Sequence, residues 1–257
     1  MRLKNILFFI LILSSFHINI AKAQGYKIKT IVIDAGHGGV KPGAAGKYSL
    51  EKNVALKVAL KLGKMLEEEL PGIKILQIRK TDVDVDWYRR AEIANDAKAD
   101  LFISIHCNSM PKGNNTTRGT ETFVGAYRRI NEMDAGIKEN EDIIKDKDYK
   151  KKGAYNPTDP EELIMLSLYK SLFRTKSLAL AKMIQKNYTE VNKRVNRGVK
   201  EQGLLILQRC AMPSVLTEIG FISNPAEEDY MNSEDGQKEI VTAIVDAIKQ
   251  YKKQIEN

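Results

Sequence analysis

Short apolar runs rich in β-branched residues alternate along this chain with longer segments of helical periodicity. The runs expected to form strands occupy 28–34, 73–79, 101–106, 120–124, 204–208 and 214–218. Helical periodicity covers 50–70, 87–98, 160–191 and 237–252. This alternation predicts a single α/β domain with a mixed, mostly parallel six-stranded sheet and helices on both faces. In such sheets, ligands bind beyond the carboxyl ends of the strands.

The first residues of the chain have the pattern of a secretory signal peptide. Two basic residues precede an apolar run at 6–13, and an Ala-Lys-Ala sequence ends at Ala23. A membrane anchor is the alternative, but spanning a bilayer takes about 20 apolar residues. We therefore expect residues 1–23 to be cleaved near Ala23, leaving a domain at 25–257. The mature protein is then periplasmic or secreted, with no stable insertion in the membrane.

The charge of the chain limits its partners without choosing among them. The formal net charge is +8, and cleavage removes three basic residues and no acid, so +5 remains. This excess suits an anionic polymer, whether peptidoglycan or nucleic acid. Charge alone does not choose between these polymers, but binding to nucleic acid conflicts with export, so we expect no nucleic acid as a partner.

Two cysteines, Cys107 and Cys210, are too few for a disulfide scaffold. They could pair in an oxidising compartment. Each lies beside a strand-like run, however, where a buried free thiol is the commoner state. We therefore expect buried free thiols at both positions.

Polar side chains lie at or just beyond the ends of three predicted strands. His37 follows the first strand, His106 ends the third, and Glu218 ends the last. Because the carboxyl ends of parallel strands meet at one edge of a sheet, we expect these side chains to lie close together. The glycines on both sides of His37 permit a tight turn there. Asp34 either orients a histidine or caps the loop.

Glu51 lies in the first turn of the predicted 50–70 helix, on the same face as the apolar stripe that begins at Val54 and Ala55. A buried carboxylate is costly unless it has a partner. One explanation is a dipole or capping interaction at the helix N-terminus. A metal cation explains the burial better, because this helix end points to the same edge of the sheet.

The remaining histidines favour zinc. His17 lies in the leader, so the mature chain has only His37 and His106. A lone histidine at a strand end is more often structural, but two of them beside a buried-face carboxylate favour metal ligands. Two histidines, one glutamate and an open water position form a catalytic zinc set, whereas Mg²⁺ and Ca²⁺ prefer more oxygen ligands. The residues thus predict a zinc hydrolase for an amide or ester, with one Zn²⁺ per chain held by His37, Glu51 and His106.

From about residue 27 to 252, the chain resembles the zinc-dependent N-acetylmuramoyl-L-alanine amidases. The resemblance depends on four blocks, which are 31–39 (IVIDAGHGG), Glu51 within 50–54, 91–108 (AEIANDAKADLFISIHCN) and 212–225 (MPSVLTEIGFISNP). It implies that His37, Glu51 and His106 bind zinc and that Glu218 is the catalytic glutamate. Cys107 departs from the family pattern, which usually has a small alanine after the histidine, but the ligands are intact.

The function implied by the resemblance is hydrolysis of the amide bond between N-acetylmuramic acid and L-alanine in peptidoglycan. This reaction serves cell-wall remodelling or daughter-cell separation. One alternative is a zinc peptidase that cuts stem peptides with the same ligands. Another is a non-catalytic peptidoglycan-binding relative, which the intact set of ligands and Glu218 disfavours. The chain shows no wall-binding module, so recruitment by a periplasmic activator protein is also expected.

Residues 125–177 form an insertion that the sheet does not require. Its first part, 138–152, is densely charged, and a capping pattern at 159–162 begins a short apolar helix. We expect this insertion to be a lid that restrains the enzyme. It resembles the inserted regulatory region of Gram-negative division amidases, in which a helix blocks the zinc until a partner removes it. The alternative is a helix that extends the core and shapes the substrate groove.

Overall fold

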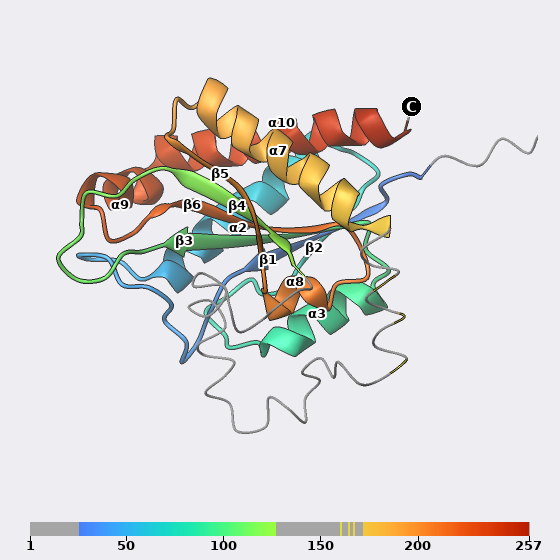
Figure 1. Cartoon of the computed structure of the whole chain (residues 1–257), viewed down its shortest axis with the longest axis horizontal. Coiled ribbons are helices and arrows are strands. Elements are labelled where there is room, and N and C mark those ends of the chain that lie inside the picture. The colour runs from blue at the N-terminus through green and yellow to red at the C-terminus, as the bar shows by residue number, and fades with distance from the viewer. Residues whose placement is uncertain (1–25, 127–159, 161–163, 165–166, 168–171, 257) are drawn as a thin grey trace, which may run out of the picture.

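The computed structural model describes residues 26–126, 160, 164, 167 and 172–256. Its sheet has six strands in the order β2-β1-β3-β6-β4-β5 (Figure 1). The strands are β1 (Thr30–Ala35), β2 (Lys74–Gln77), β3 (Leu101–Asn108), β4 (Thr120–Gly125), β5 (Asn196–Gln202) and β6 (Ser214–Phe221).

Most strand pairings in this sheet are parallel. β2, β1, β3 and β6 run in one direction, and β5 runs parallel to β4. The exception is the antiparallel pairing of β4 with β6. The C-terminal ends of β1, β3 and β6 therefore lie at one edge of the sheet, where β4 and β5 begin. This is the mixed, mostly parallel six-stranded sheet that the sequence predicts.

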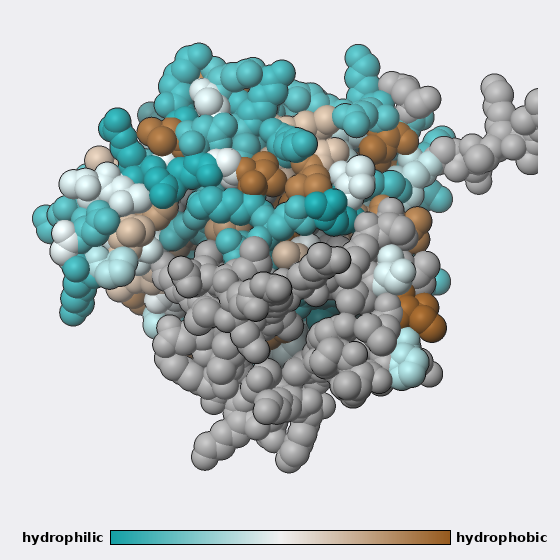
Figure 2. All heavy atoms as spheres, viewed as in Figure 1, coloured by the Kyte–Doolittle hydropathy of each residue, from teal (hydrophilic) through white to brown (hydrophobic). Residues whose placement is uncertain are grey.

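Helices cover both faces of the sheet (Figure 1). One face carries α2 (Glu51–Glu69), α7 (Arg174–Glu190) and α10 (Glu234–Glu256). The other carries α3 (Trp87–Asp96) and the single turn α8 (Leu205–Gln208), while α9 (Pro225–Asn232) follows β6. Over α7 and α10, the described surface in Figure 2 is mostly hydrophilic with small apolar patches, as expected for helices whose apolar sides face a sheet.

Strand side chains alternate between two apolar layers. On β1, Ile31 and Ile33 join the layer under α2, α7 and α10, whereas Val32 joins the layer under α3 and α8. Burying one such side chain contributes about 1.5–3 kcal/mol, so the two layers together hold the strands in register. Cys107 lies in the first layer and Cys210 in the second, and both are free thiols as expected.

The strand predicted at 204–208 is wrong. Leu205–Gln208 forms the helical turn α8, and the sheet instead gains β5, whose sequence is NRGVKEQ. A run of five apolar and polar residues suits one buried turn of helix as well as a strand, and here Leu205 packs with Trp87. β5 is an edge strand that pairs only with β4, so it carries little of the apolar alternation that marks a strand.

Within the helix predicted over 160–191, α7 covers Arg174–Glu190, and residues 160, 164, 167 and 172 are also helical. α9 is not among the helices predicted from the sequence, although its start has a clear signal. The Asn224 side chain accepts hydrogen bonds from the backbone N–H groups of Ala226 and Glu227, and proline follows at the first helical position.

The predicted signal peptide at 1–23 and most of the predicted insertion at 125–177 lie outside the described residues. Both therefore stay predictions from the sequence. Within the part of the chain that the structure describes, no helix combines the length and apolar content needed to cross a bilayer.

Candidate metal centre

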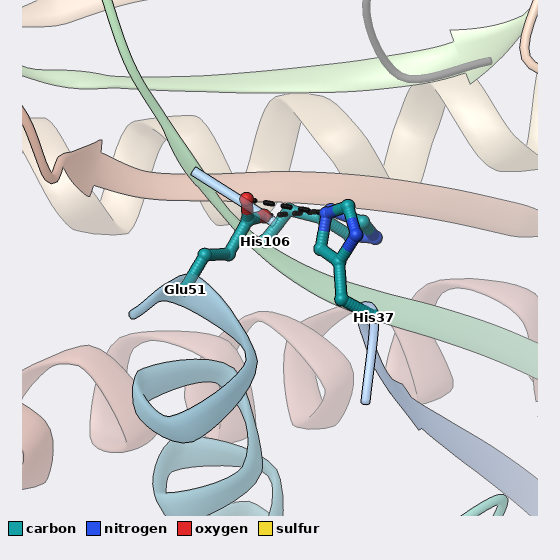
Figure 3. A group of neighbouring side chains, drawn as sticks. All are labelled: His37, Glu51 and His106. Carbon is teal, nitrogen blue, oxygen red and sulfur yellow. Dashed lines mark hydrogen bonds and ion pairs between the residues drawn. The ribbon is translucent and has the colours of Figure 1, made fainter. Parts of the chain in front are cut away.

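Three side chains from separate elements meet at the C-terminal edge of β1 and β3 (Figure 3). His37 follows β1, His106 belongs to β3, and Glu51 is the first residue of α2. Each offers one ligand atom, and these atoms lie within 4.8 Å of one another. The structure thus brings together the three residues that the sequence predicts as ligands.

The carboxylate of Glu51 lies between the two imidazoles. Its Oε1 is 2.9 Å from His106 Nδ1, and its Oε2 is 3.2 Å from His37 Nε2. Backbone N–H groups fix the same oxygens, because Cys107 donates to Oε1 over 3.0 Å and Ala44 donates to Oε2 over 2.8 Å. The imidazole planes meet at 69° with ring centroids 5.1 Å apart. The rings therefore converge on the carboxylate from different directions.

Burial and charge act in opposite directions on Glu51. The side chain is only 2% exposed, and burial alone would raise its pKa. The charge and hydrogen bonds of His37 and His106 outweigh burial and lower the pKa well below its ordinary value. The carboxylate is therefore ionised at neutral pH, and it needs positive charge beside it. Protonated imidazole can supply that charge, and a divalent cation bound by the two neutral rings can replace those protons.

Two glycines make room for the ligands. A Cβ atom at Gly36 would lie 2.4 Å from the His106 ring. A Cβ atom at Gly43 would lie 2.6 Å from Glu51 Oε2 and 2.6 Å from His37 Cδ2. Both distances are far below van der Waals contact, so any larger residue would displace a ligand.

Glu218 lies beside this group but is not part of it. On β6 it pairs in register with His106 of β3, and its side chain is 1% exposed. Paired residues on neighbouring strands point to the same face, and the strands lie about 4.8 Å apart. On its other side, Glu218 pairs with Glu121 of β4. A buried carboxylate thus stands next to the predicted metal ligands, as the sequence predicts.

The contacts of Glu121, the carboxylate that pairs with Glu218, were not predicted from the sequence. Glu121 accepts hydrogen bonds from Asn108 Nδ2 and from Lys200 Nζ. Arg197 Nε lies 3.9 Å from Glu121 Oε2. The only available signal was the strand-like run at 120–124, which does not show which strand it pairs with.

Asp34 forms its hydrogen bonds with an arginine and a serine and not with a histidine ring. Its carboxylate accepts hydrogen bonds from Arg90 Nη1 over 2.8 Å and from the Ser104 hydroxyl over 2.7 Å. Burial would raise the pKa of Asp34, but Arg90 and then the Ser104 hydroxyl lower it below its usual value. Asp34 is therefore the anionic partner of a buried arginine.

The loop that leads into Glu51 is anchored by Glu228 of α9. The Glu228 carboxylate accepts hydrogen bonds from the backbone N–H groups of Lys47, Tyr48 and Ser49, at 2.7–2.9 Å, and from the Ser49 hydroxyl. Burial would raise its pKa, but these donors lower it below its ordinary value. One side chain thus joins the start of α2 to the helix that follows β6.

Comparison with known proteins decides the family. The family model described as N-acetylmuramoyl-L-alanine amidase (Amidase_3) matches residues 31–250. The chain belongs to this family. It is a hydrolase of the N-acetylmuramoyl-L-alanine amide bond of peptidoglycan, as the sequence predicts.

Individual relatives agree with this assignment. The N-acetylmuramoyl-L-alanine amidase AmiA of Escherichia coli K12 is 32% identical over 236 residues, which cover 90% of this chain and 78% of AmiA. A crystal structure of an N-acetylmuramoyl-L-alanine amidase from Clostridium difficile 630 has a TM-score of 0.65 at 27% identity and covers 88% of this chain and 97% of its own. The CwlD amidase of Clostridioides difficile, solved in complex with the GerS lipoprotein, has a TM-score of 0.61 at 27% identity, with coverage of 87% and 98%.

The anchor at Glu228 predicts a pH-dependent loss of stability. The folded-state pKa is below that of the unfolded chain, so its contribution is present above the unfolded value of about 4.5 and is lost as the pH falls toward the folded value. For Glu228→Gln we expect a melting temperature about 4–8 °C lower at neutral pH, because charge-assisted hydrogen bonds worth about 2 kcal/mol weaken. The difference should narrow as the pH falls below about 4.5.

Differential scanning calorimetry between neutral and acidic pH measures this difference. Asp229→Asn is the matched control, because Asp229 is the next residue and its contact with the Tyr48 hydroxyl is exposed. A difference between Glu228→Gln and the parent that stays constant over this pH range would rule out Glu228 as the titrating group.

Proposed function

We propose that this protein is an exported, zinc-dependent amidase in which His37, Glu51 and His106 hold one Zn²⁺ per chain. The observation that supports this most strongly is the convergence of their ligand atoms within 4.8 Å. Two imidazoles and one carboxylate suit zinc and leave a coordination position for water or substrate. The family typically depends on zinc, in agreement with this donor set.

Within this proposal, Glu218 is the catalytic base. Bound zinc lowers the pKa of a water molecule from about 15.7 to about 7 and polarises a carbonyl group. The Glu218 carboxylate accepts a proton from the attacking water while the water oxygen forms a bond to the carbonyl carbon of the N-acetylmuramoyl lactyl group. The same carboxyl then donates the proton to the nitrogen of L-alanine as the C–N bond breaks. Its pairing with His106 on the neighbouring strand supports this role.

We also propose export and restraint. The basic, apolar and Ala-Lys-Ala segments at 1–23 support cleavage near Ala23, and N-terminal sequencing of the exported protein locates the cut. The length and composition of 125–177 support a restraining insertion. The solved complex of the CwlD amidase with a lipoprotein supports a protein activator.

Removal of the ligands tests the metal. His37→Ala and His106→Ala should each lose most of the one zinc per chain that the parent retains after dialysis, because each removes one of three protein ligands. Elemental analysis measures the zinc content, and circular dichroism checks that the variants fold. Full zinc retention in both folded variants would overturn the assignment.

Glu218→Gln separates binding from catalysis. We expect zinc content close to that of the parent and turnover lower by about 10²–10⁴, the usual contribution of a general base. The assay is mass analysis of products from purified peptidoglycan, with and without a chelator. The parent should release intact stem peptides, whereas shortened peptides would indicate the stem-peptide peptidase. A variant that keeps most of the parental rate would exclude Glu218 as the base.

Replacement of residues 139–170 by a short Gly/Ser linker tests the restraint. If the insertion covers the site, dye release from labelled peptidoglycan should be faster than with the parent. A folded deletion variant with no gain in rate would exclude restraint by this segment.

A further inference from the structure

The first predicted ligand has an unusual backbone conformation. His37 has φ of 55°, in the left-handed region that non-glycine residues rarely adopt. Gly38 and Gly39 follow with φ of 128° and 55°. A histidine stays in this conformation only where its surroundings hold it there. The groups around this turn therefore decide where the imidazole lies.

One of these groups is the buried guanidinium of Arg90, from α3. Its Nη2 donates to the carbonyl of His37 over 2.6 Å, and its Nη1 donates to the carbonyl of Ala35 over 2.7 Å. Its Nε donates to the carbonyl of Val85 over 2.7 Å, which fixes the guanidinium itself. Arg90 thus binds the carbonyl of the last residue of β1 and the carbonyl of His37.

The second group is the guanidinium of Arg79, which lies just after β2. Its Nε donates to the carbonyl of Ala35 over 3.0 Å. Its Nη2 donates to the carbonyls of Gly36 over 2.8 Å and of Lys52 over 2.7 Å. Gly36 directly precedes the first histidine ligand, and Lys52 directly follows the glutamate ligand. Arg79 therefore joins the two chain segments that carry these ligands.

The same network reaches the strand of the third ligand. Asp34 accepts hydrogen bonds from Arg90 and from the hydroxyl of Ser104. Ser104 lies two residues before His106 on β3 and so points to the same face of the sheet. The network thus touches a residue within two positions of every predicted ligand.

Such a network is costly for a purely structural contact. Arg79 and Arg90 are 3% and 4% exposed. The carboxylate of Asp34, which is completely buried, lies near both guanidinium groups. Burial and then the charge of Arg90 lower the pKa of Arg79. What guanidinium groups offer in return is five N–H donors in a rigid planar fork, which lysine lacks. This geometry lets two side chains hold the carbonyls of three consecutive residues.

We propose that Arg79 and Arg90 are positioning residues that set the metal affinity of this site. By holding the carbonyls of residues 35–37, the guanidinium pair keeps His37 in its left-handed conformation, with its Nε2 3.2 Å from Glu51 Oε2. The inference rests on the proposed zinc site and adds to it two residues that contact neither zinc nor substrate.

Arg79→Lys and Arg90→Lys test the proposal, because lysine keeps the charge but its single ammonium nitrogen lacks the planar fork that reaches carbonyls of separate chain segments. Arg89→Lys is the matched control, since Arg89 lies next to Arg90 on α3 but is exposed and pairs with Glu92. Zinc affinity is measured by competition with a chelator, and the visible absorption of the Co²⁺-substituted protein reports ligand geometry. The melting temperature of the metal-free protein is measured alongside.

We expect zinc affinity to fall by about 10–100-fold in Arg79→Lys and Arg90→Lys, the usual effect of losing a group that orients a ligand. Their Co²⁺ spectra should change, and those of the parent and of Arg89→Lys should agree. If both variants had the zinc affinity and the Co²⁺ spectrum of the parent, the proposal would be wrong. The arginines would then have a structural role only, whatever the melting temperature of the metal-free variants. Failure of both to fold would also count against the proposal, because the arginines would then support the whole fold. If the parent itself bound no zinc, the proposed function would fail instead.

Discussion

The buried carboxylate of Glu51 is the feature on which the arrangement of this protein depends. An ionised group that is 2% exposed must have donors or positive charge around it, and here they come from three separate parts of the chain. The backbone of Cys107 and Ala44 provides two donors, and His37 and His106 bring the rings. These parts meet because the apolar layer under α2 fixes the helix start against the ends of β1 and β3, and because Arg79 joins Gly36 to Lys52.

The face of the sheet under α3 changes from apolar to polar along four strands, toward the edge that carries the predicted ligands. On β1 and β3 the change comes at the paired residues Asp34 and Ser104, whereas on β6 it comes one step later in the register, at Glu218. β4 runs the other way and accordingly reverses the order, with Glu121 before Phe123. The part of this face away from the ligand edge therefore belongs to the core, and the part at that edge belongs to the site. The same strands thus serve both fold stability and chemistry.

The sequence predicts well whatever depends on local pattern. Strand ends place His37, His106 and Glu218 at one edge, and the helical stripe places Glu51 on the buried side, because both inferences need only periodicity and the parallel direction of strands. It fails where the decisive partner is distant. β5 has a polar edge sequence, and Leu205 packs against Trp87 from a distant part of the chain. Arg79, Arg90 and Glu228 likewise bind backbone groups that are distant in sequence. Such long-range contacts produce no pattern of spacing or composition in the sequence from which they could be predicted.

The alternation of β3 has a consequence for redox chemistry. His106 and Cys107 are neighbours in sequence, yet the thiol belongs to the apolar layer under α2 and the imidazole points to the opposite face. The backbone N–H of Cys107, in contrast, donates a hydrogen bond to the carboxylate of Glu51. The second thiol, Cys210, lies in the other layer, where burial and then Asp34 raise its pKa well above the usual value and keep it protonated. Because both sulfurs lie outside the predicted ligand group, oxidation of either thiol would convert no predicted ligand, and the protonated Cys210 offers no thiolate to an oxidant.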